Sequence, residues 1–265
     1  MHENGSGGGP ERNGPLLRVR GIDKSFGAVQ ALKGVDFEVR RGEVVALIGD
    51  NGAGKSTLIN VITGVFPPDS GEIVFEGERV EFASPHDARD RGIEAVYQDL
   101  AVAPQLDAVA NIFLGRERRM GRILGRLGFL DQQRMRRETE EQLEELHVRI
   151  PDPAKPLSTF SGGQRQGVAV ARAVMWASKV VVMDEPTAAL GVAQAGMVLN
   201  LVRRVRQTGI PVVFISHNMP QVFDVADRVV VLRLGEVVAE LDPEKASTDE
   251  AVAAMTGSLR EEESA

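Results

Sequence analysis

Short, almost wholly apolar segments recur along the second half of the chain, and segments with helical spacing separate them. The apolar runs lie at residues 180–183, 212–216 and 229–232, where Val, Ile and Leu dominate and polar residues do not alternate with them. Helical spacing covers about 192–207 and 220–226. Strands without a polar side are typical of a sheet that is buried on both faces. The pattern predicts an α/β fold with a mostly parallel sheet between helices.

Alternating patterns near the N-terminus predict antiparallel strands. Residues 16–19 and 35–39 alternate apolar with polar side chains, and residues 73–75 and 80–82 flank Gly77 in the manner of a hairpin. A further short, buried strand is expected at about 93–97. The first part of the chain therefore combines the start of the α/β core with an antiparallel β subdomain.

The hydrophobic pattern changes from short strand-like runs to helical periodicity over residues 99–177, which predicts an inserted helical lobe. The charged amphipathic run 132–147 predicts a helix, with Asp107 and Asp131 as candidate N-caps. Residues 115–128, rich in Gly and Arg, are expected to form a loop with solvated arginines. The predicted organisation is a flexible Gly-rich tail (1–14), a single domain (15–258) with its α/β core at 15–98 and 178–258 and its helical lobe at 99–177, and an acidic tail (259–265).

One buried strand, residues 44–48, leads into a glycine-rich loop. The sequence from Gly49 to Ser56 fits the phosphate-loop pattern G-x-x-x-x-G-K-S, between a strand and a helix. Glycines let backbone amides approach an anion at the positive end of the helix. We expect Lys55 to reach the β and γ phosphates of a nucleotide, Ser56 to ligate Mg²⁺ and Thr57 to contact the α phosphate. A Gly-rich turn that binds nothing is the alternative. The residues expected to contact nucleotide here are Gly49, Asp50, Asn51, Gly52, Ala53, Gly54, Lys55, Ser56 and Thr57.

Two other features fit a bound nucleotide. Asp184 and Glu185 end the strand at 180–183; Asp184 can reach Mg²⁺, in most cases through water, and Glu185 can polarise the attacking water. A solvated strand end is the alternative. Phe26 lies between the first two strands, where an exposed ring facing the phosphate loop would stack on adenine. The alternative for Phe26 is an ordinary place in the core.

A second candidate anion site is the stretch 160–166, Phe-Ser-Gly-Gly-Gln-Arg-Gln, ahead of a helix expected at 167–177. It combines a serine hydroxyl, glycine amides and a helix N-terminus. The stretch closely resembles the signature of ABC-type ATPases. Because the chain already has one phosphate loop, the resemblance implies that this second site serves ATP bound to another copy, in a head-to-tail homodimer with ATP at the interface. Its expected residues are Ser161, Gly162, Gly163 and Gln164.

The resemblance covers nearly the whole chain after the tail. Gln98 matches the family's Q-loop, which senses Mg²⁺ and the transmembrane partner, and His217 matches the switch histidine that contacts the γ phosphate. A histidine after a buried strand is otherwise usually a packing or capping residue. The implied catalytic residues are Glu185, His217, Lys55 and Gln98, and the implied metal ligands are Ser56, Gln98 and Asp184.

Two departures from the family's pattern stand out. Phe160 replaces a common Leu, which keeps an apolar anchor and should be mild. Gly191 stands where the family usually has Asp, a carboxylate that helps couple the two sites across the dimer. This departure from the family pattern predicts that hydrolysis is slower here or is coupled differently, or that this copy needs a partner.

Three more stretches, at 51–58, 64–73 and 109–117, look like the ATP-binding subunits of bacterial monosaccharide importers of the ribose, xylose and fructose type. A single cassette favours the branch that works as a homodimer. The resemblance implies an ATPase with ATP and Mg²⁺ as cofactors, which powers a permease served by a periplasmic-type or lipid-anchored sugar-binding protein. Its place would be the cytoplasmic face of the plasma membrane. The alternatives are an ABC ATPase for another cargo (a nucleoside, an amino acid or an exported compound), a soluble ABC ATPase acting on DNA or ribosomes, and a non-ABC P-loop kinase.

Composition narrows the range of partners. The formal charge of -7, from 31 basic and 38 acidic residues, argues against a nucleic-acid partner. With 265 residues, 43% of them hydrophobic, the chain can bury a substantial core. The absence of cysteine fits an intracellular location. Residues 1–10 lack the apolar centre of a signal peptide, and no apolar run approaches the roughly 18 residues of a membrane span. Membrane contact is expected only through a partner.

Overall fold

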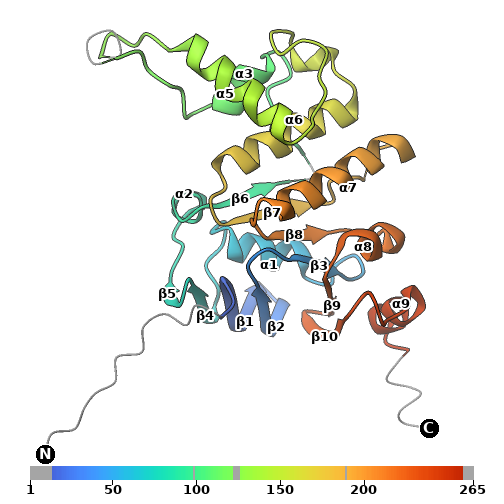
Figure 1. Ribbon diagram of the computed structural model, residues 1–265. Coiled ribbons are helices and arrows are strands. Elements are labelled where there is room, and N and C mark those ends of the chain that lie inside the picture. The colour runs from blue at the N-terminus through green and yellow to red at the C-terminus, as the bar shows by residue number, and fades with distance from the viewer. Residues whose placement is uncertain (1–13, 98, 122–125, 189, 259–265) are drawn as a thin grey trace, which may run out of the picture.

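Two β-sheets form the lower part of the molecule, and a group of helices stands above them (Figure 1). The computed structural model describes residues 14–97, 99–121, 126–188 and 190–258. The smaller sheet is antiparallel, with the order β2-β1-β4-β5, and the larger sheet has the order β10-β9-β3-β8-β7-β6. The strands are β1 (Leu17–Phe26), β2 (Val29–Val39), β3 (Val44–Ile48), β4 (Ser70–Phe75), β5 (Glu78–Val80), β6 (Ile93–Val96), β7 (Val180–Asp184), β8 (Val212–Ile215), β9 (Arg228–Arg233) and β10 (Glu236–Leu241).

The larger sheet is parallel from β9 to β6, with β10 as its antiparallel edge. Successive residues of β3 point to opposite faces: Val45 and Leu47 belong to the core between the two sheets, whereas Val44, Ala46 and Ile48 belong to the core beneath the helices. Both faces of the strand are therefore apolar, which is why the sequence shows no alternation there. This arrangement confirms the predicted α/β fold class with its antiparallel β subdomain.

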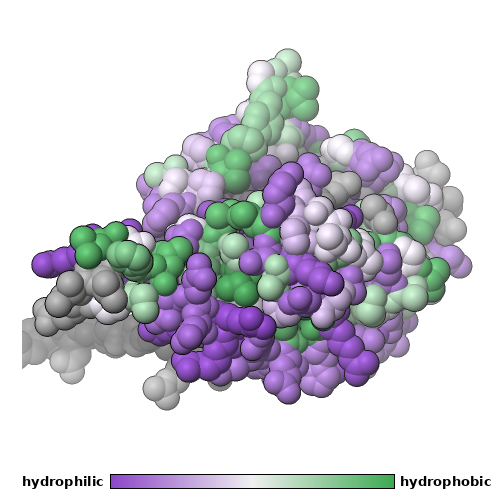
Figure 2. Space-filling model, turned by 90° about the horizontal axis from the view of Figure 1, so that it is seen from above, coloured by the Kyte–Doolittle hydropathy of each residue, from purple (hydrophilic) through white to green (hydrophobic). Residues whose placement is uncertain are grey.

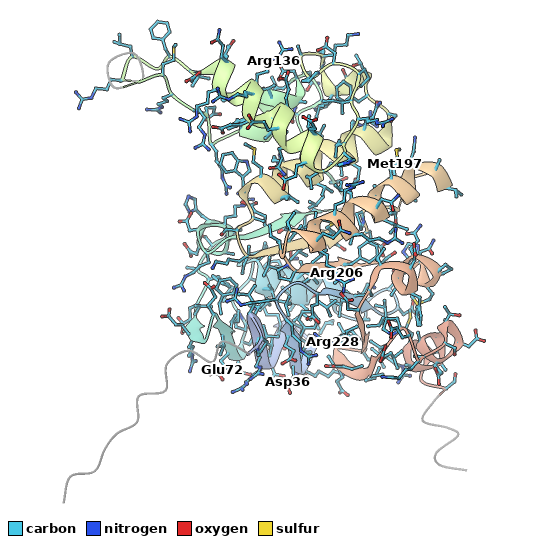
Figure 3. The ribbon with its side chains drawn as sticks, viewed as in Figure 1. Asp36, Glu72, Arg136, Met197, Arg206 and Arg228 are labelled. Atoms are coloured by element: carbon cyan, nitrogen blue, oxygen red, sulfur yellow. The ribbon has the colours of Figure 1, made fainter. Side chains whose placement is uncertain are left out.

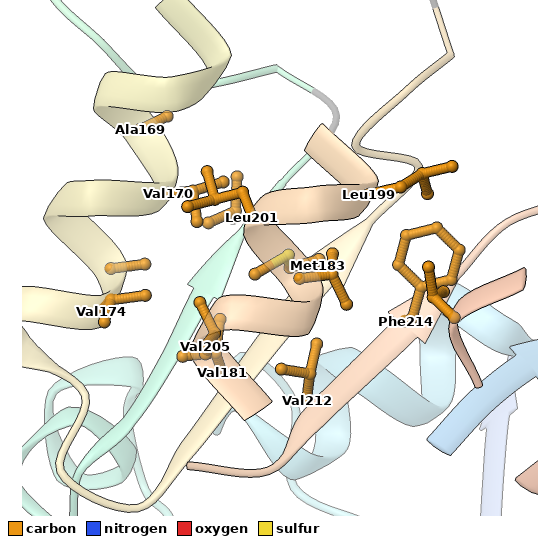
Figure 4. Close-up of a cluster of buried hydrophobic side chains, with 14 of the residues drawn as sticks. Ala169, Val170, Val174, Val181, Met183, Leu199, Leu201, Val205, Val212 and Phe214 are labelled. Atoms are coloured by element: carbon orange, nitrogen blue, oxygen red, sulfur yellow. The ribbon is translucent and has the colours of Figure 1, made fainter. Parts of the chain in front are cut away.

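Helices cover both faces of the larger sheet. Helix α1 packs between the two sheets, while α6 and α7 pack on the other face. There Val170, Leu201 and Val205 of the helices belong to the same buried cluster as Met183 and Phe214 of the strands (Figure 4). Among the described residues, no helix is long and apolar enough to cross a membrane. The helices are α1 (Lys55–Ile62), α2 (Pro85–Asp90), α3 (Ala108–Phe113), α5 (Gln132–Glu145), η1 (Leu157–Thr159), α6 (Gly162–Trp176), α7 (Val192–Gln207), α8 (Met219–Val225) and α9 (Thr248–Thr256).

Capping residues set several helix starts. Asp107 and Asp131 accept hydrogen bonds from backbone amides at the starts of α3 and α5, as predicted. The predicted start of α6 at residue 167 is wrong, because the helix begins at Gly162. Ser161 and Gln164 form a capping box there, with reciprocal side-chain to backbone hydrogen bonds of 2.9 and 3.3 Å. That box overrides the low helix propensity of the two glycines.

Three elements were not predicted, among them the single 3-10 turn η1. Helix α2 follows Ser84 and begins with Pro85, and its six residues are too short to show a clear period. Strand β10 (Glu236–Leu241) is a half-buried edge strand that pairs with β9. Strands β1 and β2 are also longer than expected, because register shifts let them continue past the alternating segments, and Phe26 is the last residue of β1.

A buried arginine links the two sheets. Arg228, on β9, donates to the Glu38 carbonyl of β2 at 2.7 Å and to the Glu43 carboxylate at 2.9 Å (Figure 3). It also pairs with Glu240 on β10 at 3.2 Å. Since a buried arginine needs such partners, the pairs fix the smaller sheet against the edge of the larger one.

The arginines expected to be solvated at 115–128 are in part structural. Arg116 pairs with Glu94 of β6 at 2.6 Å, and its guanidinium lies 4.9 Å from the centroid of the Trp176 ring. Arg118 pairs with Glu138 at 3.2 Å and lies 5.3 Å from the same ring. That expectation is corrected for these two residues, which attach this segment to α6 and to the core. Sequence spacing gave no sign of these contacts because Trp176 lies far along the chain.

Replacing Phe214 with Ala is expected to destabilise the protein by about 3–5 kcal/mol. Phe214 is fully buried on β8 beneath α7, so the change removes a ring from a close-packed cluster (Figure 4). Urea unfolding measures the free energy, with Val192→Ala as the control because Val192 is 94% exposed. A loss below about 1 kcal/mol for Phe214→Ala would contradict the packing described here.

Candidate functional site

The phosphate loop joins β3 to α1, and two of its glycines are needed because other backbone comes close. A Cβ on Gly49 would overlap the carbonyl oxygen of Leu232, and a Cβ on Gly54 would lie 2.6 Å from the carbonyl oxygen of Ala31. Gly52 meets no such obstacle but has a φ of 80°, in the left-handed region. The loop is therefore enclosed by β2 and β9, and its shape requires glycine at all three positions.

Lys55 is the first residue of α1, and its ammonium is turned back on the loop. Its Nζ donates to the carbonyl oxygens of Gly49 at 2.8 Å and Asp50 at 3.0 Å. Ser56 is exposed and Thr57 is half-buried in the same first helical turn. The amides of a first turn have no partner within the helix, so this end of α1 offers N–H groups and one cation to an anion.

The acidic pair and the histidine lie at the same edge of the sheet. Strand β7 ends in Asp184, β8 ends one residue before Ser216, and β3 lies next to β8, so all three parallel strands present their carboxyl ends together. Glu185 adopts a left-handed φ of 49° and donates its amide to the carbonyl of Ile215 at 3.0 Å. Its Oε1 lies 2.9 Å from Nδ1 of His217. The fold therefore joins two residues whose contact the sequence could not show.

Electrostatics make this edge receptive to a cation. Burial raises the pKa of Asp184, the charge of Glu185 raises it further, and Lys55 acts in the opposite direction. The Oε2 atom of Glu185 is buried without a hydrogen-bond partner in the described part of the chain. An unpartnered buried carboxylate oxygen costs free energy unless it meets water or a ligand. Among the described residues, no group of three or more His, Cys, Asp or Glu side chains forms a ready-made metal cage.

The signature residues cap α6 and pack against the loop that follows Glu185. Ser161 is exposed, and its Oγ accepts the amide of Gln164, which leaves the hydroxyl proton for another acceptor among the described residues or an anion. A Cβ on Gly162 would lie 3.2 Å from Leu190, and one on Gly163 would lie 3.1 Å from Gln194 of α7. In Figure 1 the signature belongs to the upper helical part and the phosphate loop to the lower part. One copy thus carries two separate helix N-termini whose backbone amides suit an anion.

A hollow lies behind the signature, between α6 and α7. Its volume is about 370 Å³, and its lining includes Val148, Gly167 and Met197. Figure 3 shows Met197 on α7, beneath the helical group. A Cβ on Gly167 would lie 2.7 Å from a methyl group of Val148, so a larger residue here needs the Val148 side chain to move. His147 and Arg204 cross this gap, with Nη1 of Arg204 at 3.1 Å from Nδ1 of His147.

One pair at the site was missed by sequence analysis. Thr187 is buried and donates its hydroxyl to Oε1 of Gln221, on α8, at 2.6 Å. This bond holds the loop after Glu185 against the helix after His217. No spacing or motif signals the pair, because its members lie in different crossovers of the sheet.

Phe26 lies at the tip of the β1–β2 hairpin, and its side chain is 44% exposed, so it is not an ordinary core residue. Its ring contacts Phe66 edge-on, with centroids 5.3 Å apart. One predicted site residue, Gln98, lies outside the described residues. The role of Gln98 therefore stays a prediction.

The family follows from a comparison with known proteins. The profile of the ABC transporter family matches residues 32–188, more than half of the chain. The chain belongs to the ABC transporter family. Within that family it is 49% identical to the xylose/arabinose import ATP-binding protein XylG of Sulfolobus acidocaldarius, over 91% of this chain and 94% of the relative. It is 50% identical to the fructose import ATP-binding protein FrcA of Rhizobium meliloti, over 92% of this chain and 94% of that relative.

Other relatives are longer. The ribose import ATP-binding protein RbsA 1 of Rubrobacter xylanophilus is 43% identical over 94% of this cassette, which spans only 48% of that relative. Solved structures agree on the fold. A nucleotide-free ATP-binding cassette from an ABC transporter superposes with a TM-score of 0.74 at 29% identity, covering 91% of this chain and 95% of that one. A dimeric cassette in a post-hydrolysis state, bound to ADP and Pi, gives 0.72 at 25% identity, covering 86% and 99%.

Proposed function

We propose that this ABC ATPase is the energy-supplying subunit of a bacterial-type importer for a monosaccharide. The observation that carries the proposal is that two relatives matched over almost their full length are import ATP-binding proteins for pentoses and fructose. The site has the parts that ATP hydrolysis needs: a phosphate loop, a carboxylate with a free buried oxygen and a histidine beside it. ATP binding and hydrolysis would drive the transport cycle of a membrane partner.

The proposed roles follow the geometry of each group. Lys55, with the amides from Gly49 to Thr57, holds the phosphates and offsets the charge that develops during phosphoryl transfer. Glu185 orients and deprotonates the attacking water, and His217 holds the Glu185 carboxylate and contacts the γ phosphate. Phe26 stacks on adenine through its exposed ring. Gln98 is proposed to sense the metal and the permease.

Magnesium fits the donor set at the edge of the sheet. Ser56 supplies a hydroxyl and Asp184 a carboxylate, the hard oxygen ligands that Mg²⁺ prefers together with phosphate oxygens and water. The raised pKa of Asp184 supports this assignment, because a nearby cation would stabilise its ionised form. When bound, the metal would neutralise charge on the β and γ phosphates. The protein's part is to hold Ser56 and Asp184 on adjoining elements of the site.

We further propose that two copies bind ATP head to tail. The signature residues Ser161, Gly162, Gly163 and Gln164 of one copy would complete the site formed by the phosphate loop of the other. The available Ser161 hydroxyl and the free first-turn amides of α6 support a second phosphate contact. The helical lobe, residues 99–177, would carry this turn toward the partner copy when ATP binds.

The proposed membrane partner is a multi-span permease, served by a sugar-binding protein and holding the cassette at the cytoplasmic face of the membrane. Apolar side chains are exposed around the helical lobe, and Figure 2 shows green, apolar atoms on the segment that projects from it. An exposed apolar surface of this kind is typical of a protein contact site. No nucleic-acid partner is proposed. The exposed apolar residues of this segment and its surroundings are Leu106, Leu114, Met120, Leu127, Phe129 and Leu130.

The test is a pull-down from membranes with tagged Glu185→Gln protein and Mg-ATP, followed by mass spectrometry. Recovery of a multi-span permease together with a sugar-binding protein is the expected result. If the permease is recovered with a binding protein for a nucleoside or an amino acid, the proposed cargo becomes that compound in place of a monosaccharide. Recovery of ribosomes or DNA-repair proteins without a permease would overturn the importer proposal.

Replacing Gly191 with Asp is expected to change the cooperativity of ATP hydrolysis. Gly191 is the N-cap of α7 at the ordinary φ of -69°, and no described atom lies within 4 Å of an added Cβ. The new side chain therefore fits without strain and adds a capping acceptor. It also restores a carboxylate near the dimer interface. The Hill coefficient for ATP measures the effect, and an unchanged coefficient would count against a coupling role at this position.

A further inference from the structure

The ring of Phe26 is held by the segment that leaves α1. This segment, residues 65–70, is called the strap here. Its amides at Val65 and Phe66 donate to the carbonyl of Asn60 on α1, at 2.8 and 3.2 Å. The strap therefore begins as a rigid continuation of the helix whose first turn forms part of the phosphate loop.

The strap is bonded to the end of β1 by several contacts. Asp69 accepts the ammonium of Lys24 at 2.7 Å and the amide of Ser25 at 2.6 Å, and its own amide donates to the carbonyl of Asp23 at 2.9 Å. The Ser70 hydroxyl adds a bond of 2.6 Å to the Asp23 carboxylate. These bonds engage the three residues directly before Phe26, so they fix the backbone that leads into the ring.

The side chains of the strap also fix the ring itself. Phe66 meets Phe26 at an interplanar angle of 74°, with centroids 5.3 Å apart, and the Lys24 ammonium lies 5.7 Å from the centre of the Phe26 ring. Edge-to-face rings at this separation attract each other beyond simple burial. The Phe26 ring remains 44% exposed, so surface is left for a base to stack on.

We propose that Phe66 and Asp69 are positioning residues that set Phe26 at the distance from the phosphate loop that a nucleoside triphosphate requires. One continuous piece of chain, α1 with its strap, reaches the phosphates at one end and the ring at the other. The inference rests on the proposed role of Phe26 as the base platform. An ordered platform binds more tightly because less conformational freedom is lost when the base stacks.

The test separates the base from the phosphates. Binding of Mg-ATP and of inorganic tripolyphosphate with Mg²⁺, which has no base, is measured by competition with a fluorescent ATP analogue. Phe66→Leu is expected to weaken ATP binding by about two- to tenfold and to leave tripolyphosphate binding unchanged. The KM for ATP should rise by the same factor while kcat at saturation stays within about twofold. Val252→Ala is the control, since it shortens an exposed apolar side chain on α9, outside the strap and the phosphate loop.

Further variants identify the route of the effect. Asp69→Ala keeps both rings but removes the bonds to Lys24 and Ser25, and it should reproduce the ATP-specific loss. Phe66→Tyr should restore wild-type affinity. In the double variant Phe26→Ala/Phe66→Leu, ATP affinity should equal that of Phe26→Ala alone, because Phe66 acts through Phe26.

Two outcomes overturn the inference in distinguishable ways. If Phe26→Ala weakens ATP binding but Phe66→Leu and Asp69→Ala do not, or if they weaken tripolyphosphate binding equally, the positioning role fails and the base platform stands. If Phe26→Ala itself leaves ATP affinity unchanged, the proposed base platform fails together with the strap's role.

Discussion

Replacing Glu185 with Gln is expected to lower the kcat of ATP hydrolysis by about 10²–10⁴-fold while ATP still binds. The change removes the proposed carboxylate base but keeps the shape of the side chain. In the described structure its Oε2 is buried without a partner and its Oε1 meets His217. With hydrolysis blocked, the ATP-bound dimer should accumulate. Steady-state phosphate release measures the loss of turnover, and size-exclusion chromatography with Mg-ATP detects the dimer.

The control for this prediction is Glu236→Gln, at the exposed glutamate that begins β10. It makes the same chemical change outside the site, so its turnover should equal that of the wild type. Normal turnover in Glu185→Gln would reject Glu185 as the base. Loss of ATP binding in the same variant would instead mean that the carboxylate is needed for the structure of the site. The amide would then disturb the conformation of the loop that follows residue 185.

Replacing Lys55 with Ala is expected to weaken ATP binding by about 10–100-fold, because the variant lacks a charge-assisted contact to phosphate. The Lys55 ammonium already lies at the phosphate loop, 2.8 Å from the Gly49 carbonyl, so phosphate oxygens can replace these carbonyls with little rearrangement. Isothermal titration calorimetry with Mg-ATP measures the change in Kd.

The matched control is Lys245→Ala, an exposed lysine that pairs with Asp242 ahead of α9. Its ATP affinity should not change. Thermal unfolding should show that the apo Lys55→Ala protein remains folded, since only two bonds to loop carbonyls are lost. Unchanged ATP affinity in the folded Lys55→Ala variant would contradict the assignment of this loop as the phosphate site.

Glu185 and Lys55, the two positions of the predictions above, could be identified from the sequence because each belongs to a motif of neighbouring residues. A phosphate loop needs glycine wherever backbone comes close, and it needs a lysine at the start of the helix, so Gly49, Gly54 and Lys55 carry the pattern within a few residues. An acidic pair at the end of an apolar strand is equally local, as Asp184 and Glu185 illustrate.

Boundaries were predicted less well where two local preferences compete. The glycines of the signature argued for a loop, and the capping box of Ser161 and Gln164 made them the first turn of α6. Half-buried β10 had a weak pattern because it is an edge strand with one face turned to solvent. From the sequence, Arg116 was expected to be a solvated charge, whereas in the fold it contacts Trp176 and Glu94.

The fold class, the glycine-rich loop and the acidic strand end could be read from local sequence, because hydrophobic periodicity and backbone freedom act over neighbouring residues. Which distant groups meet follows instead from the folded arrangement. It brought His217 to Glu185, Gln221 to Thr187 and Phe66 to Phe26. Such contacts depend on strand order and on the path of each crossover, which are set by the packing of the whole sheet and leave no periodic trace in the chain.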